Sequence, residues 1–242
     1  MKFGVLLTLL FLCPLMVAQE AVDLDEEPHF HPLLDNDQVK VFALTLHSGE
    51  SALVRLDHSF LTVALQDGEI IIWDEGKSPI QHFQVHKGET SFRCWSSICL
   101  NQEQLAKGLS GGFRNDRQND YRNITVEFLD PRIGWNLPEG GLISPPASMY
   151  VGDAIVADVL LQPGEAFPAP DKPGAELLIP VTDVDLKGDA GHYHHSAGEV
   201  AWIAAEHTSE LTNAGREAAR FIVVEFRPGD SDPERRPRRY RR

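Results

Sequence analysis

Hydrophobic residues along this chain are grouped into short runs that are separated by Gly, Pro, Asp and Asn. The runs are rich in Val, Ile, Leu and Phe, a composition typical of β-strands bounded by turns. No long stretch keeps the 3.6-residue period of an amphipathic helix, although residues 102–109 could form one or two helical turns. Many short, evenly spaced strands predict a sandwich or barrel, with strands at residues 39–46, 61–65, 69–73, 80–85, 124–129, 155–161, 177–181, 199–204 and 220–226.

The strand pattern occurs twice, with matching features in the same order. Each copy has a run ending in Gly-Glu, a second Gly-Glu and a closing run ending in Val-Glu-Phe, which pairs residues 39–50 with 154–165, 88–89 with 198–199 and 123–128 with 221–226. We therefore expect two units, at residues 27–130 and 149–228, joined by a Pro- and Gly-rich linker at residues 131–148. The separation of matched positions falls from 115 to 98 residues, so the first unit is longer, and its Gly-, Asn- and Gln-rich residues 100–118 are predicted to be an inserted surface loop.

The N-terminus has the layout of a secretory signal peptide. A positive start at Lys2 precedes an apolar stretch over residues 3–17, and Ala18 is a suitable last residue before cleavage. We therefore expect residues 1–18 to be removed and the mature protein to be secreted or periplasmic. A lipoprotein signal at Cys13 is less favoured, because large residues precede this cysteine where small ones are needed.

The mature chain keeps two cysteines, Cys94 and Cys99. In an oxidising compartment a local disulfide between them is the first expectation. A thiolate metal site or a reactive thiol is the alternative.

Composition excludes several classes of protein. With 42% hydrophobic and 24% charged residues among 242, the chain is neither wholly disordered nor collagen-like nor a coiled coil. The net charge of −14 argues against nucleic-acid binding by the body of the protein. The segment at residues 229–242 is rich in Arg and Pro, and we expect it to be disordered. It either contacts an anionic surface or folds back loosely on the acidic body.

The glycine spacing of both units resembles that of the cupin superfamily. Gly49 and Gly68 stand at the spacing of the first cupin motif, G-x5-H-x-H-x3-E-x6-G, and Gly88 begins the second, G-x5-P-x-G-x2-H-x3-N. In the second unit the two motifs start at Gly164 and Gly198. The resemblance implies an all-β fold of two tandem cupin-type antiparallel jelly-roll barrels, a bicupin. In cupins the motif histidines and glutamate bind one divalent metal.

The metal-ligand positions of these motifs are degenerate. In the first unit they are Arg55, Asp57 and Leu61, followed by Cys94, Ser96, Cys99 and Glu103 across the second motif; in the second unit they are Pro170, Lys172 and Glu176, followed by Ala204, Glu206, Ser209 and Asn213. Only Glu176 and Asn213 match the family. An arginine is not a metal ligand, because it stays protonated. The resemblance therefore implies barrels without a metal cofactor, with Arg55, Asp57, Lys172, Glu176 and Ser209 as candidate binding residues in the barrel interior.

Displaced histidines offer an alternative metal site for Fe, Mn, Ni or Zn. His58 lies one residue from the expected cluster, and His207 could be a shifted ligand that partners Glu176. His192 and His194 are two residues apart, so they point to the same face of a strand, and the repeat pairs His192 with His82. Such a pair is either a metal clamp or a polar outer face.

Arg55 and Asp57 also share a strand face. If that face lines the barrel, the two side chains could bind a carboxylate or sugar hydroxyls; otherwise they form a rim salt bridge.

These observations favour a non-catalytic protein over an enzyme. The chain has no G-x-S-x-G, no Gly-rich phosphate loop, no H-E-x-x-H and no C-x-x-C. Our first hypothesis is an exported degenerate bicupin that binds a small molecule or glycan, or that self-assembles into a homo-oligomer, without a metal. The alternatives are a metal-dependent cupin enzyme of the dioxygenase or isomerase type, and an interaction protein whose Arg-rich tail docks on an anionic partner.

Overall fold

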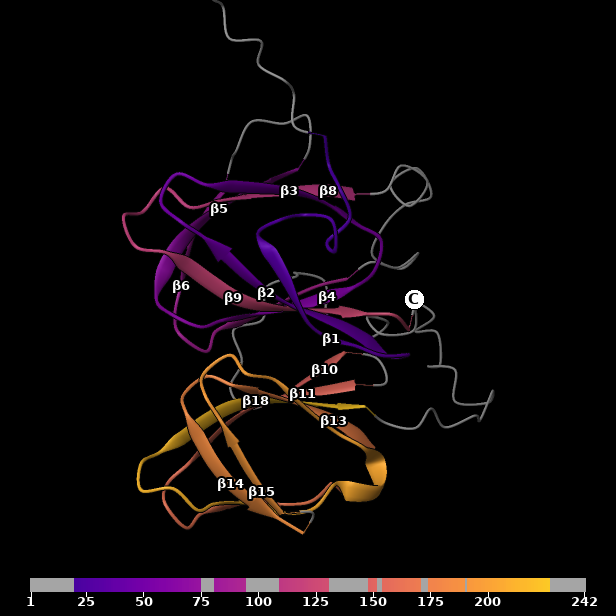
Figure 1. Cartoon of the computed structure of the whole chain (residues 1–242), viewed down its shortest axis with the longest axis vertical. Helices are drawn as coiled ribbons and strands as arrows, with labels where there is room; N and C mark the ends of the chain where they lie inside the picture. Colours follow the sequence, from indigo (N-terminus) through magenta and orange to yellow (C-terminus); the bar gives the residue numbers. More distant parts are fainter. Residues whose placement is uncertain are drawn as a thin grey trace, which may run out of the picture.

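Two bodies of antiparallel strands follow one another along the chain (Figure 1). The computed structural model describes residues 20–74, 81–94, 109–130, 148–151, 154–170, 174–189 and 191–226. Apart from the short 3-10 helix η1 (Ala205–His207), all regular elements in these ranges are strands. The predicted all-β class is therefore confirmed.

Each body consists of nine strands in two sheets. We call the first barrel 1; it contains β1 (Phe30–Asp35), β2 (Val39–Leu46), β3 (Ser51–Leu56), β4 (Phe60–Ala64), β5 (Gly68–Asp74), β6 (Gln81–Val85), β7 (Thr90–Arg93), β8 (Leu109–Arg114) and β9 (Tyr121–Phe128). Barrel 2 contains β10 (Ser148–Val151), β11 (Ala154–Leu161), β12 (Ala166–Phe167), β13 (Ala175–Pro180), β14 (Val184–Gly188), β15 (Gly191–His195), β16 (Ala201–Ile203), β17 (Leu211–Asn213) and β18 (Ala219–Phe226).

The sheet order of barrel 2 repeats that of barrel 1 strand for strand. The five-stranded sheets, which we call the inner sheets, run β1-β2-β9-β4-β7 and β10-β11-β18-β13-β16. The four-stranded outer sheets run β3-β8-β5-β6 and β12-β17-β14-β15. The two predicted tandem jelly-roll barrels are thereby confirmed, and every strand of one barrel has a counterpart in the other.

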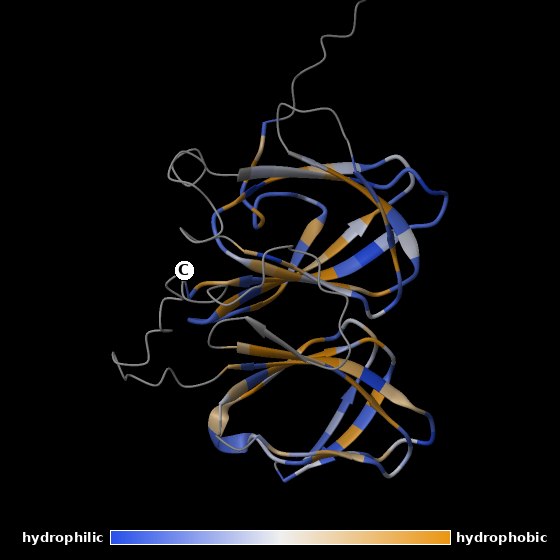
Figure 2. Cartoon of the chain, turned by 180° about the vertical axis from the view of Figure 1, so that it is seen from behind, coloured by the Kyte–Doolittle hydropathy of each residue, from blue (hydrophilic) through white to orange (hydrophobic). Residues whose placement is uncertain are grey.

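The inner sheets pack against each other, so both of their faces are buried. Alternate side chains of β2, β4 and β9 meet those of β11, β13 and β18 in one shared cluster, the interface core, which includes Val41, Leu61, Val126, Leu177 and Val224. The side chains between them fill the two barrel interiors. Figure 2 shows these adjoining strands as the most hydrophobic part of the ribbon. Burial on both faces explains why the inner strands read as almost continuous apolar runs.

The repeated Gly-Glu pairs form four equivalent turns. Gly49, Gly88, Gly164 and Gly198 have φ between 81° and 85°, a conformation that glycine adopts without strain. In each turn the following glutamate accepts a hydrogen bond from the backbone N–H three residues earlier, at 2.7–3.1 Å. The cupin-like glycines are thus retained for the shape of the barrels.

Two of these turns contact the opposite barrel. Gly88 lies against Arg220 on β18, whose guanidinium binds Asp158 at 2.8 Å and donates to the carbonyl oxygen of Lys87 at 2.7 Å. Gly198 lies against Leu65 of barrel 1. The same turn is therefore used twice, once from each barrel, to hold the two together.

The expected surface loop at residues 100–118 is wrong for its second half. Residues 109–114 form β8, which pairs with β3 and β5 inside the outer sheet. Its glycines permit close approach, because a Cβ at Gly112 would overlap the indole of Trp73 and one at Gly111 would lie 3.3 Å from Leu56. The extra length of barrel 1 therefore falls between β7 and β8.

Several predicted segments lie outside the described residues: the signal peptide at 1–18, the tail at 229–242 and all of the predicted linker at 131–148 except Ser148, which begins β10. No helix in the described part of the chain is long and apolar enough to cross a membrane.

Candidate functional site

Arg55 and Asp57 do not line barrel 1. Their neighbours Val54 and Leu56 belong to the apolar core of this barrel, so Arg55 points outward. Its side chain is 45% exposed and binds Asp23 at 3.1 Å and the carbonyl oxygen of Ala21 at 3.2 Å. Asp57 follows the end of β3 and is exposed. The expected interior face is therefore displaced by one residue, and Arg55 instead fastens the N-terminal segment to β3.

His58 does point toward the interior end of barrel 1, but its partner is a carboxylate. Its Nδ1 lies 3.0 Å from Oε1 of Glu127, which stands on the inward face of β9 in line with Asn123 and Thr125. This hydrogen bond raises the pKa of His58 above its ordinary value, because it favours the protonated ring. The pair is an ion pair at the barrel end.

The other candidate histidines lie on the outside. His192 is 63% exposed and faces Asp185 at 3.6 Å, and His194 is exposed on the same face of β15. His207 is exposed on η1, and in the described part of the chain no hydrogen bond or ion pair joins it to Glu176.

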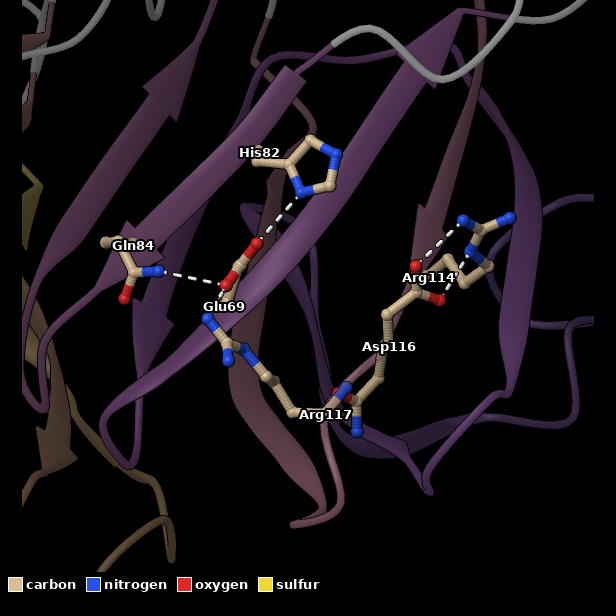
Figure 3. Close-up of polar contacts among 7 residues, drawn as sticks. Glu69, His82, Gln84, Arg114, Asp116 and Arg117 are labelled. Carbon is tan, nitrogen blue, oxygen red and sulfur yellow. Dashed lines mark hydrogen bonds and ion pairs between the residues drawn. The ribbon is translucent and has the colours of Figure 1, made fainter.

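Barrel 1 has the same arrangement on its outer sheet, with His82 at the position of His192. His82 lies 2.8 Å from Glu69, which also accepts hydrogen bonds from Gln84 and Arg117, beside the ion pair of Arg114 with Asp116 (Figure 3). The predicted pairing of His82 with His192 is confirmed by the strand register. His82, His192 and His194 therefore belong to polar outer faces of the sheets, rather than to a metal clamp formed by a pair of histidines on one strand.

The interior of barrel 2 contains a pair of carboxyl groups. Glu176 on β13 and Glu225 on β18 are directly opposite each other in register. Both face inward, because Leu178 and Val223, two residues away on each strand, belong to the barrel 2 core. Glu176 is 2% exposed, and no described residue forms a hydrogen bond or ion pair with it. We call Glu176 and Glu225 the carboxyl pair.

Burial and the neighbouring carboxyl both act on the protonation of Glu176. Loss of solvent first, and repulsion by Glu225 second, raise the pKa of Glu176 to about 7. Tyr193 on β15 faces the same interior, and burial together with the charge of Glu176 raises the pKa of its phenol. Glu176 therefore titrates near neutral pH, so it can donate or accept a proton or a hydrogen bond there.

Other candidate residues of barrel 2 have structural partners or are not described. Ser209 is buried, and its Oγ accepts a hydrogen bond from the backbone N–H of Asp189 at 3.0 Å. Asn213 donates hydrogen bonds to the carbonyl oxygens of Leu161 and Glu217. In barrel 1, Asn115 donates the equivalent bonds to the carbonyl oxygens of Leu46 and Asn119. The family-like asparagine is thus a turn residue whose counterpart is Asn115, and Glu103 was the wrong match. Lys172 lies outside the described residues.

The predicted disulfide is supported at one end. Cys94 is disulfide-bonded. Cys99 lies outside the described residues, so its pairing with Cys94 stays a prediction.

Position by position, the two barrel interiors differ in chemistry. Register pairing matches Glu176 with Phe60 and Tyr193 with Phe83. Four large side chains of barrel 1 are also replaced by smaller ones in barrel 2: Phe42 by Ala157, Leu44 by Val159, Ile72 by Gly188 and Tyr121 by Ala219. The described interior of barrel 1 therefore combines large apolar groups with the polar residues Asn123, Thr125 and Glu127 of β9. Barrel 2 has Phe221 and Val223 at the first two of these positions, and it carries Glu176 and Tyr193 where barrel 1 has phenylalanines.

Several solved structures share this fold. The cupin 2 conserved barrel domain protein from Leptotrichia buccalis has a TM-score of 0.50 and 12% sequence identity, over 82% of this chain and 88% of that one. The protein has the cupin fold. AerE from Microcystis aeruginosa matches with a TM-score of 0.56 and 11% identity over 84% of this chain and 99% of its own. Procruciferin, an 11S globulin from Brassica napus, matches with a TM-score of 0.50 and 10% identity over 84% of this chain and 85% of its own.

No family model and no curated protein matches the sequence. At these identities the structural similarity establishes the fold alone.

The metal of the cupin motifs does not fit the described side chains. No group of three or more His, Cys, Asp or Glu residues among them could hold a metal ion. Glu176 keeps its motif position, but its interior neighbours are Glu225 and Tyr193 rather than imidazoles. We therefore derive no step through a metal.

Glu225 and Tyr193 were not predicted as site residues. The repeated Val-Glu-Phe contained a signal for Glu225, because a glutamate recurs there between two apolar residues in both barrels.

Proposed function

We propose that this cupin is a non-catalytic, metal-free binding protein whose ligand site is the interior of barrel 2. The observation that carries the proposal is Glu176, a buried carboxyl without a partner among the described residues, at the position where barrel 1 has Phe60. Burying an unpaired carboxyl is unfavourable. Because a phenylalanine satisfies the same position of the same fold, folding alone does not require the glutamate, and a ligand is the reason to keep it.

Barrel 1 serves as the scaffold in this proposal. Its core contains Phe30, Phe42, Phe60 and Phe113, and Leu24 of the N-terminal segment packs into the same cluster. The ion pair of His58 with Glu127 already satisfies the polar end of this barrel. These contacts support a packed body that positions barrel 2 through the interface core.

We also propose that the protein acts outside the cytoplasm, as a secreted or periplasmic bicupin. The hydrophobic leader with a cleavage position after Ala18 supports this location. The disulfide of Cys94 supports it independently, because structural disulfides persist in oxidising compartments.

Ligand-observed NMR tests the binding proposal directly. Saturation-transfer spectra of a mixture of small polar fragments, including monosaccharides, would be recorded with the full chain and with Glu176→Leu and Tyr193→Phe. His58→Gln in barrel 1 is the matched control. We expect fragments that bind the parent and His58→Gln but lose their signal with Glu176→Leu.

Two results would contradict the proposal. One is a set of fragments that bind equally well to Glu176→Leu, which would place the site elsewhere. The other is stoichiometric metal in the parent that His58→Gln or His207→Gln removes, which would restore the alternative of an enzyme with displaced histidine ligands.

A further inference from the structure

The free edge of β1 in barrel 1 carries an exposed leucine. β1 is the edge strand of its inner sheet, since it pairs with β2 alone among the described strands. Leu33 is the extra residue of a bulge in β1, where the register shifts between Pro32 and Leu34, and it is 42% exposed. In the described part of the chain, Leu33 and Leu160 are the exposed large hydrophobic residues. The edge of β1 therefore offers an apolar contact that the packing of the barrel does not use.

Carboxylates flank this leucine. Asp35 and Asp37 are exposed at the turn of the β1–β2 hairpin, and no described residue forms a hydrogen bond or ion pair with either side chain. Asp25 is 53% exposed beside them, since it lies 3.5 Å from Lys40, which is paired in register with Asp35. Residues 20–37 contain seven Asp and Glu residues and no Lys or Arg. We call this part of barrel 1 the hairpin surface; it consists of Asp25, Leu33, Asp35 and Asp37.

The chain leaves barrel 2 close to the hairpin surface. Phe226, the last residue of β18, packs on Phe128 with ring centroids 6.1 Å apart, and Phe128 is paired in register with Val39, the first residue of β2. Leu34 of β1 packs against the same interface core that contains Phe226. β18 therefore ends beside the β1–β2 hairpin, on the same side of the molecule in Figure 1.

The residues that follow β18 carry the complementary charge. Six arginines and one glutamate stand among the last ten residues of the sequence. Eight residues separate Phe226 from Arg235, the first of these arginines, which gives a reach of at most roughly 30 Å. A connection of this length gives the arginines an effective concentration of about millimolar at the hairpin surface. Surface ion pairs that are too weak to hold a separate peptide can therefore act together within one chain.

We propose that the Arg-rich tail docks on the hairpin surface of its own barrel 1. Its guanidinium groups bind the carboxylates of Asp35 and Asp37, and Tyr240, the one aromatic residue of the tail, covers Leu33. Docking neutralises this acidic edge and withholds the arginines from other anionic surfaces. The inference is independent of the ligand site in barrel 2.

NMR spectra of the backbone amides of the full chain test this docking. Three variants are compared with the parent: a tail variant with all six arginines replaced by serine, Asp35→Asn with Asp37→Asn, and a control, Glu206→Gln with Glu210→Gln, which removes the same charge from exposed side chains of barrel 2. We expect the tail variant to shift the amide signals of Leu33, Asp35 and Asp37. About 0.5 M NaCl should shift the same signals of the parent, because salt screens exposed ion pairs. The amide signals of the tail should shift in Asp35→Asn with Asp37→Asn and stay unchanged in the control.

Retention on a heparin column gives a second readout. Asp35→Asn with Asp37→Asn should release the tail, so this variant should elute at a higher NaCl concentration than the control variant of equal charge. Equal elution of the two would show that the hairpin surface does not mask the arginines. Unchanged amide signals in the tail variant, or shifts confined to other surfaces, would also overturn the proposal. Shifts that disappear when the protein is diluted would assign the tail to a second copy of the chain instead.

Discussion

Single side chains decide which barrel is suited to bind a ligand. Glu176 and Phe60 occupy the same place in the same fold, and several of the side chains around them differ in volume. Because the surrounding backbone is equivalent, this difference in chemistry is not explained by the needs of the jelly roll. It is explained by a requirement of barrel 2 alone.

The protonation of Glu176 makes a prediction for stability. Its pKa is about 7 when folded and near 4.5 in the unfolded chain, so the folded state binds more protons between these values and stability falls as pH rises from 4.5 through 7. Glu176→Gln removes this dependence. We expect the stability of the parent relative to the variant to fall by about 3 kcal/mol from pH 4.5 to pH 8, measured by urea denaturation.

Glu206→Gln is the control for this experiment, because Glu206 is a glutamate of the same barrel whose side chain is exposed on η1. It should leave the pH profile of stability unchanged. A parent-like profile in Glu176→Gln would mean that Glu176 is not buried as a proton-binding group.

The candidate site was predictable only in part. The motif spacing selected Glu176 and Ser209, and both lie buried in barrel 2. The same spacing selected Arg55, which points outward, because a register that is displaced by one residue exchanges the two faces of a strand. Tyr193 was missed, since one aromatic residue in a strand gives no sign of which sheet it will face.

Among the secondary-structure elements, the strands of the inner sheets were the most predictable. Their apolar runs are long because both faces are buried, and β2 has the predicted bounds. β8 was missed because Gly111 and Gly112 have the composition of a loop, and only the tertiary contact with Trp73 explains them. The repeat itself indicated the error, since Asn115 and Asn213 have the same spacing to their closing strands.

The four Gly-Glu turns allow a matched test of the contacts between the barrels. A Cβ at Gly88 would lie 2.5 Å from Cζ of Arg220, and one at Gly198 would lie 2.8 Å from Cδ1 of Leu65. A Cβ at Gly49 or Gly164 would meet nothing within 4 Å. All four substitutions to alanine share the strain of positive φ, about 1–2 kcal/mol, but Gly88→Ala and Gly198→Ala must also displace a side chain at the interface.

We therefore expect Gly88→Ala and Gly198→Ala to lower the free energy of unfolding more than Gly49→Ala and Gly164→Ala do. Urea denaturation of the four variants measures the difference. Equal losses at all four turns would show that the turns contribute nothing to the association of the barrels.

At the level of the whole molecule, the interface core joins two barrels into one folding unit. Separating the inner sheets would expose Val41, Leu61, Val126, Leu177 and Val224, all of which are almost fully buried, to water. We expect one cooperative thermal transition, with equal calorimetric and van't Hoff enthalpies. Two resolved transitions in differential scanning calorimetry would show instead that each barrel is stable without the other.

This division of roles is the centre of the account: barrel 1 is a filled scaffold and barrel 2 holds the ligand. A crystal structure of the full chain soaked with a mixture of small amines and polyols tests it most directly. We expect bound density inside barrel 2, in contact with Glu176, Glu225 and Tyr193, and none inside barrel 1. Density in the interior of barrel 1, or ligands bound only on the outer surface, would contradict it.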